Sequence, residues 1–148
     1  MTHPFIVHLL KDHEEQRRLA EELSEAKATE DKKHLRQSLY EALYPHIEGE
    51  NASIFDFLKS KGGEARAGAL EAMQEHHVDE ILLRELMELD LEDELLTAKA
   101  KVLKEVNAHH LEEEEEEHFP RLESLADKDK LDALFETYES TEEEIKGS

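Results

Sequence analysis

Apolar residues recur every three or four positions along most of the chain, the spacing that places them on one face of an α-helix. The first stripe predicts a helix over about 3–27, with Thr2 as its cap and Pro4 in its first turn, where a missing N–H costs nothing. That stripe consists of Ile6, Leu9, Leu10, His13, Ala20 and Leu23. His13 is therefore expected to point into the core, and polar residues 26–30 are expected to form a loop.

Four further stripes predict helices over about 31–60, 64–89, 91–124 and 128–145. Their inward positions are Leu35, Leu39, Ala42, Leu43, His46, Glu50, Ile54 and Leu58; Ala69, Met73, His76, Leu83, Leu86 and Asp90; Leu96, Leu103, Val106, His110, Glu114 and Glu117; and Leu131, Leu134, Phe135 and Tyr138.

Glycine and proline mark the predicted interruptions of these helices. Pro45 should bend the second helix and Pro120 should kink the fourth near its end, because proline removes a backbone donor. Lys61-Gly62-Gly63 should separate the second helix from the third. Gly49 should allow another segment to approach the backbone closely.

Composition supports an all-α protein of one domain, residues 1–148, and narrows its chemistry. The chain has no cysteine, which excludes disulfides, thiolate metal sites and cysteine nucleophiles. Its 18 Lys and Arg against 39 Asp and Glu give a net charge of −21, which repels nucleic acid and anionic membranes. We see no transmembrane stretch and no signal peptide, so a cytoplasmic location is the expectation.

Histidine and glutamate form a repeated pattern on the predicted inner faces. His46 with Glu50, and His110 with Glu114, are four residues apart, so each pair can address one point from one helix. The helices before them carry one inward histidine each, His13 and His76. No Lys or Arg lies on the same stripes at that level, and buried carboxylates need a compensating cation.

These residue types favour particular metals. Imidazole and carboxylate without thiolate suit iron, manganese or zinc, and six ligands are too many for one tetrahedral zinc. The pattern predicts two metal ions bridged by Glu50 and Glu114, with the four histidines as terminal ligands and open positions for a small ligand.

Other histidines and glutamates compete for these roles. His77 aligns with apolar neighbours and is an alternative to His76, His109 with Glu113 is the rival pair in its helix, and His118 is an additional candidate one turn beyond Glu114. Glu112, Glu113, Glu115 and Glu116 are interpreted as a solvated face, and His3, His8 and His34 as surface residues.

The ordered set of His13, His46-x-x-x-Glu50, His76 and His110-x-x-x-Glu114 resembles the hemerythrin-like, or HHE cation-binding, family over about residues 3–140. The resemblance implies an up-down antiparallel four-helix bundle over about 3–124, with a short extra C-terminal helix over about 128–145. It also implies a non-haem di-iron centre that binds or reacts with dioxygen, nitric oxide or peroxide, with roles in iron or oxygen sensing and stress response.

Two departures from that family affect the expectations. Asn51 and Asp56 stand where relatives often have Glu and Pro, which should loosen the surroundings of Glu50. The invertebrate oxygen carriers use five histidines, and this chain has four clear ones, with His77, His109 and His118 as sources of a fifth.

Three functions follow from these observations. The first is a di-iron protein that binds or senses a small ligand or handles iron, as a monomer or dimer. The second is a di-iron oxidoreductase that reduces nitric oxide or peroxide, or repairs iron clusters, with electrons from a separate redox partner protein. The third is a helical interaction module, with or without a stabilising metal. Whether the chain is an enzyme stays open at this point.

Overall fold

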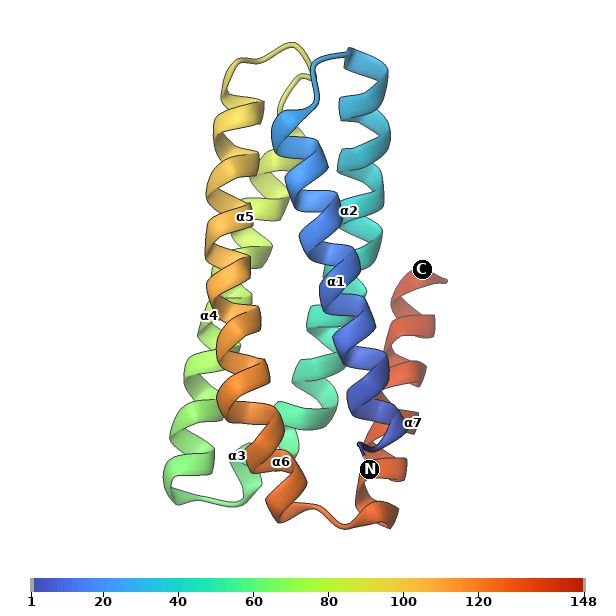
Figure 1. Ribbon diagram of the computed structural model, residues 1–148, viewed down its shortest axis with the longest axis vertical. Coiled ribbons are helices and arrows are strands. Elements are labelled where there is room, and N and C mark those ends of the chain that lie inside the picture. Colours follow the sequence, from blue (N-terminus) through green and yellow to red (C-terminus); the bar gives the residue numbers. More distant parts are fainter. Residues whose placement is uncertain (1, 148) are drawn as a thin grey trace.

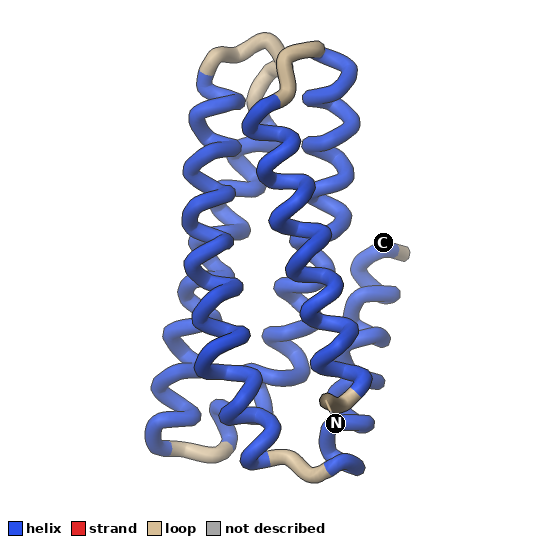
Figure 2. Tube along the Cα trace, viewed as in Figure 1, coloured by secondary structure: helices blue, strands red, loops and turns tan. Residues whose placement is uncertain are grey.

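The computed structural model describes residues 2–147, and every regular element among them is helical (Figure 2). The elements are α1 (Pro4–Glu25), α2 (Thr29–Glu50), the π-helical turn η1 (Asn51–Phe55), α3 (Asp56–Ser60), α4 (Gly63–Glu88), α5 (Leu95–Glu113), the π-helical turn η2 (Glu114–His118), α6 (Phe119–Leu125) and α7 (Lys128–Lys146). The expectation of an all-α protein is confirmed. None of the helices in this part of the chain is long and apolar enough to span a membrane.

Helices α1, α2, α4 and α5 lie side by side along the long axis (Figure 1). The loops 26–28 and 89–94 lie together at one end, and loops 61–62 and 126–127 lie at the other (Figure 2). Helices α1 and α4 therefore run toward the end with loops 26–28 and 89–94, whereas α2 and α5 run away from it. Helix α7 packs along the outside of α2 and η1.

The start of α1 differs from the prediction. His3, not Thr2, is the cap residue, because its Nδ1 accepts the backbone N–H of Phe5 at 3.0 Å. The His3 Nε2 lies 2.7 Å from Asp132, and this side chain is 10% exposed, so His3 is not a free surface residue. Pro4 occupies the first turn as expected.

The helices that contain the two prolines are interrupted by π-helical turns. Helix α2 continues through Pro45, and the irregular turn begins only at Asn51. In η1 the Ser53 hydroxyl donates to the Gly49 carbonyl at 2.7 Å, a bond from a side chain back to the preceding turn that can bend a helix. Pro120 is the second residue of α6, which follows η2, and it has no N–H to give to the regular ladder.

Several residues predicted on the inner faces lie elsewhere. Asp90 is exposed because α4 ends at Glu88, and the segment 89–94 is a loop rather than the start of the next helix. Glu117 is exposed and His118 is buried, since a π-helical turn advances less than 100° per residue and shifts the inner face by one position. Leu10 is 37% exposed, and Val106 is only half-buried.

The apolar core is divided in two along the bundle. One cluster surrounds Phe5, Phe55 and Leu122 near loops 61–62 and 126–127, and the other surrounds Leu23, Leu86 and Leu96 near the opposite end. The buried polar residues lie between these clusters, so the fold surrounds one polar layer with apolar packing on both sides.

Candidate metal centre

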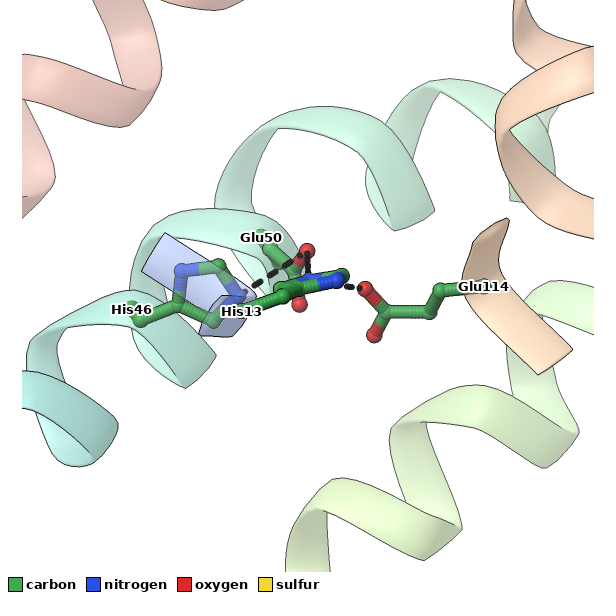
Figure 3. Close-up of side chains that lie close together, drawn as sticks. All are labelled: His13, His46, Glu50 and Glu114. Atoms are coloured by element: carbon green, nitrogen blue, oxygen red, sulfur yellow. Dashed lines mark ion pairs between the residues drawn. The ribbon is translucent and has the colours of Figure 1, made fainter. Parts of the chain in front are cut away.

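Four helices bring all six predicted residues into one buried layer. His13 comes from α1, His46 and Glu50 from the last turns of α2, and His76 from the middle of α4. His110 lies near the end of α5 and Glu114 at the start of η2, where the π-helical turn begins. Each of the six is at most 1% exposed. Figure 3 shows the side chains of His13, His46, Glu50 and Glu114 close together, with His46 and Glu50 on one helix and the other two on different segments.

The six side chains form two groups that share both glutamates. One group contains His13, His46, Glu50 and Glu114, and its potential ligand atoms all lie within 4.8 Å of one another. The second group contains Glu50, His76, His110 and Glu114 at the same spacing. The structure therefore gathers the six residues into two groups that have Glu50 and Glu114 in common.

The carboxylates are oriented so that each faces both histidine pairs. Glu50 Oε2 lies 3.2 Å from His46 Nε2, whereas Oε1 lies 3.2 Å from His76 Nε2. Glu114 Oε1 lies 3.1 Å from His13 Nε2, whereas Oε2 contacts the Nε2 atoms of His76, at 3.2 Å, and of His110. This is the arrangement required of a carboxylate that bridges two cations.

Each of the four histidines makes a hydrogen bond through Nδ1, the ring nitrogen on the side away from the centre. His13 Nδ1 lies 2.7 Å from Glu115 Oε2, and His76 Nδ1 lies 2.6 Å from Asn51 Oδ1. These partners accept a hydrogen bond, so Nδ1 carries the proton and Nε2 is left to face the centre.

The other two imidazoles have carboxylate partners as well. His110 Nδ1 lies 3.1 Å from Glu75 Oε1. His46 Nδ1 lies 2.8 Å from the Tyr138 hydroxyl and 3.2 Å from Asp12 Oδ2, and that hydroxyl donates to Asp12 at 2.6 Å. His46 is therefore oriented by α1 and α7 together.

These outer contacts repeat in the two halves of the chain, as the single histidine and the His-x-x-x-Glu pair do. The acid before each single histidine, Asp12 or Glu75, contacts the histidine of the following helix. The residue after each glutamate, Asn51 or Glu115, contacts one of the single histidines. The Asn51 amide is the one neutral member of this set of four, so the two histidine pairs have different electrostatic surroundings.

Charges in the layer stabilise one another in the absence of a metal. Burial alone would lower the pKa of His46, but the charge of Glu50 and the hydrogen bond to Asp12 outweigh it and raise that pKa to about 9. Burial and the charge of Glu114 would raise the pKa of Glu50, but His46 and His13 lower it to about 2. The carboxylates therefore stay ionised and require positive charge at Nε2, supplied either by protons or by metal ions.

Unpaired buried atoms show that protons alone satisfy the site poorly. Within residues 2–147, the Nε2 atoms of His13, His46 and His110 and both Glu50 oxygens make no hydrogen bond of acceptable geometry, although oppositely charged atoms lie within 4 Å. Such atoms cost free energy unless a further partner occupies the space between them. A cation at each group would satisfy them, so the residues fit a metal centre.

The structure separates the competing candidates. His77 and His109 are exposed, and neither is in either buried group. His109 instead lies beside Glu113 and Glu75 in a partly exposed cluster. His118 is buried, but it packs edge-on against the Phe55 ring at 5.4 Å and is in neither group.

Two predictions about neighbouring residues are wrong. Glu113 and Glu115 are not part of a solvated face, because both are half-buried, and Glu115 also pairs with Arg17 at 3.0 Å. Asn51 does not loosen the site, since its amide oxygen orients His76. The sequence analysis missed Asp12, Glu75 and Tyr138 as orienting residues, although the acid directly before each single histidine was a visible signal.

The protein is therefore all-helical and carries a buried cluster of imidazoles and carboxylates that could hold a cation. Residues 5–122 match the Hemerythrin HHE cation binding domain family. The chain therefore belongs to the hemerythrin HHE cation-binding family, and the resemblance inferred from the sequence is confirmed. Comparisons with curated proteins and with solved structures found no match.

Proposed function

We propose that the protein binds two iron ions in this layer and uses them to bind a small oxygen- or nitrogen-containing ligand. The observation that carries the proposal is the orientation of Glu50 and Glu114, each of which offers one oxygen to each histidine pair. Manganese and zinc are alternative occupants of the same donors. In this proposal the four long helices form an up-down antiparallel bundle within a single domain.

The residues would act in distinct ways. His13 and His46 would hold one ion and His76 and His110 the other, while Glu50 and Glu114 would bridge them. Bound iron would supply a Lewis acid and an electron source for the small ligand. The apolar clusters on both sides of the layer would exclude bulk water, which strengthens every electrostatic contact inside it.

Metal analysis tests this proposal directly. The protein expressed with ample iron should contain two irons per chain, and His110→Ala and Glu114→Ala should each lose stoichiometric iron. His77→Ala, on the exposed face of α4, is the matched control and should retain both ions. Two irons in both centre variants would refute the ligand assignment.

An optical spectrum recorded before and after exposure to air, nitric oxide or peroxide would then identify the ligand. The same sample with an external reductant tests for turnover. Catalytic turnover would favour the oxidoreductase over a sensor or carrier, and a metal-free protein with an unchanged melting temperature after iron addition would favour the interaction module.

A further inference from the structure

A second set of metal-ligating side chains lies on the outside of the bundle, next to the buried layer. It consists of Glu75 on α4 and of His109 and Glu113 on α5, and its potential ligand atoms all lie within 4.8 Å of one another. We call this set the outer triad. Each member directly precedes one residue of the buried layer in the sequence, namely His76, His110 or Glu114.

The outer triad has much of the geometry that three ligands of one ion require. His109 Nε2 lies 3.0 Å from Glu113 Oε1, an i, i+4 pair on one face of α5. Donors that bind one zinc ion at about 2.1 Å in tetrahedral directions are about 3.4 Å apart. The His109 side chain is 69% exposed, so an ion and its water ligands can reach the three donors from solvent.

The outer triad carries more negative charge than the side chains around it balance. Among residues 2–147, the only ion pairs of Glu75 and Glu113 are with the imidazoles of His110 and His109. Glu71, one turn earlier on α4, adds a further negative charge near Glu113. In a protein with a net charge of −21, such a point attracts divalent cations.

In the first half of the chain, helix α7 covers the positions that correspond to His109 and Glu113. These positions are Pro45 and Gly49, which have no donor atom in their side chains. The Tyr138 ring fills the space over Gly49, where an added Cβ would lie 2.7 Å from two of its carbon atoms. One edge of the buried layer is therefore closed by an aromatic ring, whereas the other presents a histidine and a glutamate to solvent.

The carboxylates that orient the histidines differ in the same way. Asp12 contacts His46 and also accepts a hydrogen bond from the Tyr138 hydroxyl at 2.6 Å. Glu75 has the equivalent place beside His110 Nδ1, at 3.1 Å, but no hydroxyl within the described chain donates to it. An ion in the outer triad would give Glu75 the second partner that Tyr138 gives Asp12.

We infer that Glu75, His109 and Glu113 bind one divalent cation at the surface, in addition to the ions of the buried layer. One imidazole and two carboxylates suit zinc, manganese or ferrous iron, and water completes the coordination. The ion joins α4 to α5 and holds Glu75 beside His110. The outer triad goes beyond the proposed function and does not rest on it, because its three donors are separate from the six buried residues.

Zinc is the probe, and equilibrium dialysis of the iron-loaded protein against zinc, followed by elemental analysis, counts both metals. The wild type should bind one zinc per chain with its iron content unchanged. His109→Ala and Glu113→Gln should each lose this zinc and keep the iron. Two matched controls should bind zinc like the wild type: Glu112→Gln removes the same charge from the adjacent exposed position, and His34→Ala removes an exposed imidazole from α2.

Several results would overturn the outer triad. They are a wild type without the additional zinc, full zinc retention in His109→Ala and Glu113→Gln, and an equal loss of zinc in Glu112→Gln, which would show diffuse attraction by the acidic surface. Loss of iron from His109→Ala would assign His109 to the buried centre instead.

The proposed function and the outer triad can fail separately. A wild type that takes up no iron refutes the proposed function, but dialysis against zinc alone still tests the surface site. The wild type should then bind one zinc more per chain than His109→Ala or Glu113→Gln. Equal zinc contents in the three proteins would refute the outer triad.

Discussion

Replacement of Gly49 by alanine should destabilise the protein through the α7 helix. A Cβ atom at position 49 would lie 2.7 Å from Cδ2 and from Cε2 of the Tyr138 ring, closer than real Cβ contacts allow. The ring cannot retreat without loss, because it is wholly buried, packs against Phe5 at 5.5 Å and holds His46 through its hydroxyl. Gly49→Ala therefore perturbs α7 docking and the metal centre together.

The expected change in the free energy of unfolding of Gly49→Ala is the sum of opposing contributions. Overpacking in a filled core costs about 1–3 kcal/mol, and each weakened hydrogen bond of the Tyr138 hydroxyl costs about 1 kcal/mol. In the opposite direction, alanine stabilises the helix by about 0.5–1 kcal/mol relative to glycine, because its helix propensity is better. The net loss of roughly 1–3 kcal/mol corresponds to a melting temperature lower by roughly 3–10 °C for a chain of this length.

Thermal unfolding followed by circular dichroism measures this effect, with Gly68→Ala on α4 as the control. There the added Cβ would lie 2.8 Å from Arg121 Nη1, the far end of a flexible side chain, and 3.3 Å from the His118 ring. Its melting temperature should change by less than about 3 °C in either direction. If Gly49→Ala is as stable as the wild type, or no worse than Gly68→Ala, Tyr138 is not the rigid contact described here.

Four further predictions concern the centre and its surroundings. Tyr138→Phe keeps the ring but removes the hydroxyl that orients His46, so the affinity for one of the two metal ions should fall about tenfold in a competitive chelator titration. His76→Ala should lose iron by elemental analysis; equal loss from His77→Ala would contradict the assignment on α4. Iron at about 100 times its dissociation constant should add about 2.7 kcal/mol to the free energy of unfolding, and an unchanged denaturation midpoint would argue against site binding. Burial raises the pKa of the Asp79 carboxyl on α4 to about 7, so the stability gain of Asp79→Asn over the wild type should depend on pH in the metal-free protein. Below the ordinary pKa of 3.8 Asp79 is protonated in both states, and between there and about 7 only the unfolded chain ionises, so the gain should grow across that range and level off above it. A stability gain that is constant from pH 4 to 7 would refute the raised pKa of Asp79.

The main helices and the six centre residues could be predicted because both signals are local. Amphipathic spacing identifies a helix without knowledge of its neighbours, and two ligands four residues apart share one face on any helix. His46 with Glu50 and His110 with Glu114 therefore retain their predicted relation in the structure.

Other features depend on contacts between distant helices and could not be predicted in this way. The bond between Asp12 and His46 requires the relative rotation of α1 and α2, which no local pattern specifies. The π-helical turn at η2 changes the angular advance per residue, so the α-helical stripe selects Glu117 where the structure buries His118. In the run of six glutamates, composition alone indicates solvent for Glu115, and only the position of His13 shows otherwise.

The sharing of Glu50 and Glu114 between both histidine pairs also has a consequence for the rate of unfolding. A metal ion at either group would join residues from three of the four long segments, and the two ions together would join all four. No single helix could then detach without breaking a metal–ligand bond, so partial opening at one edge would become slow along with global unfolding. Metal loading would thus act as a cross-link between the first helix and the end of α5, and should lengthen the native-state lifetime.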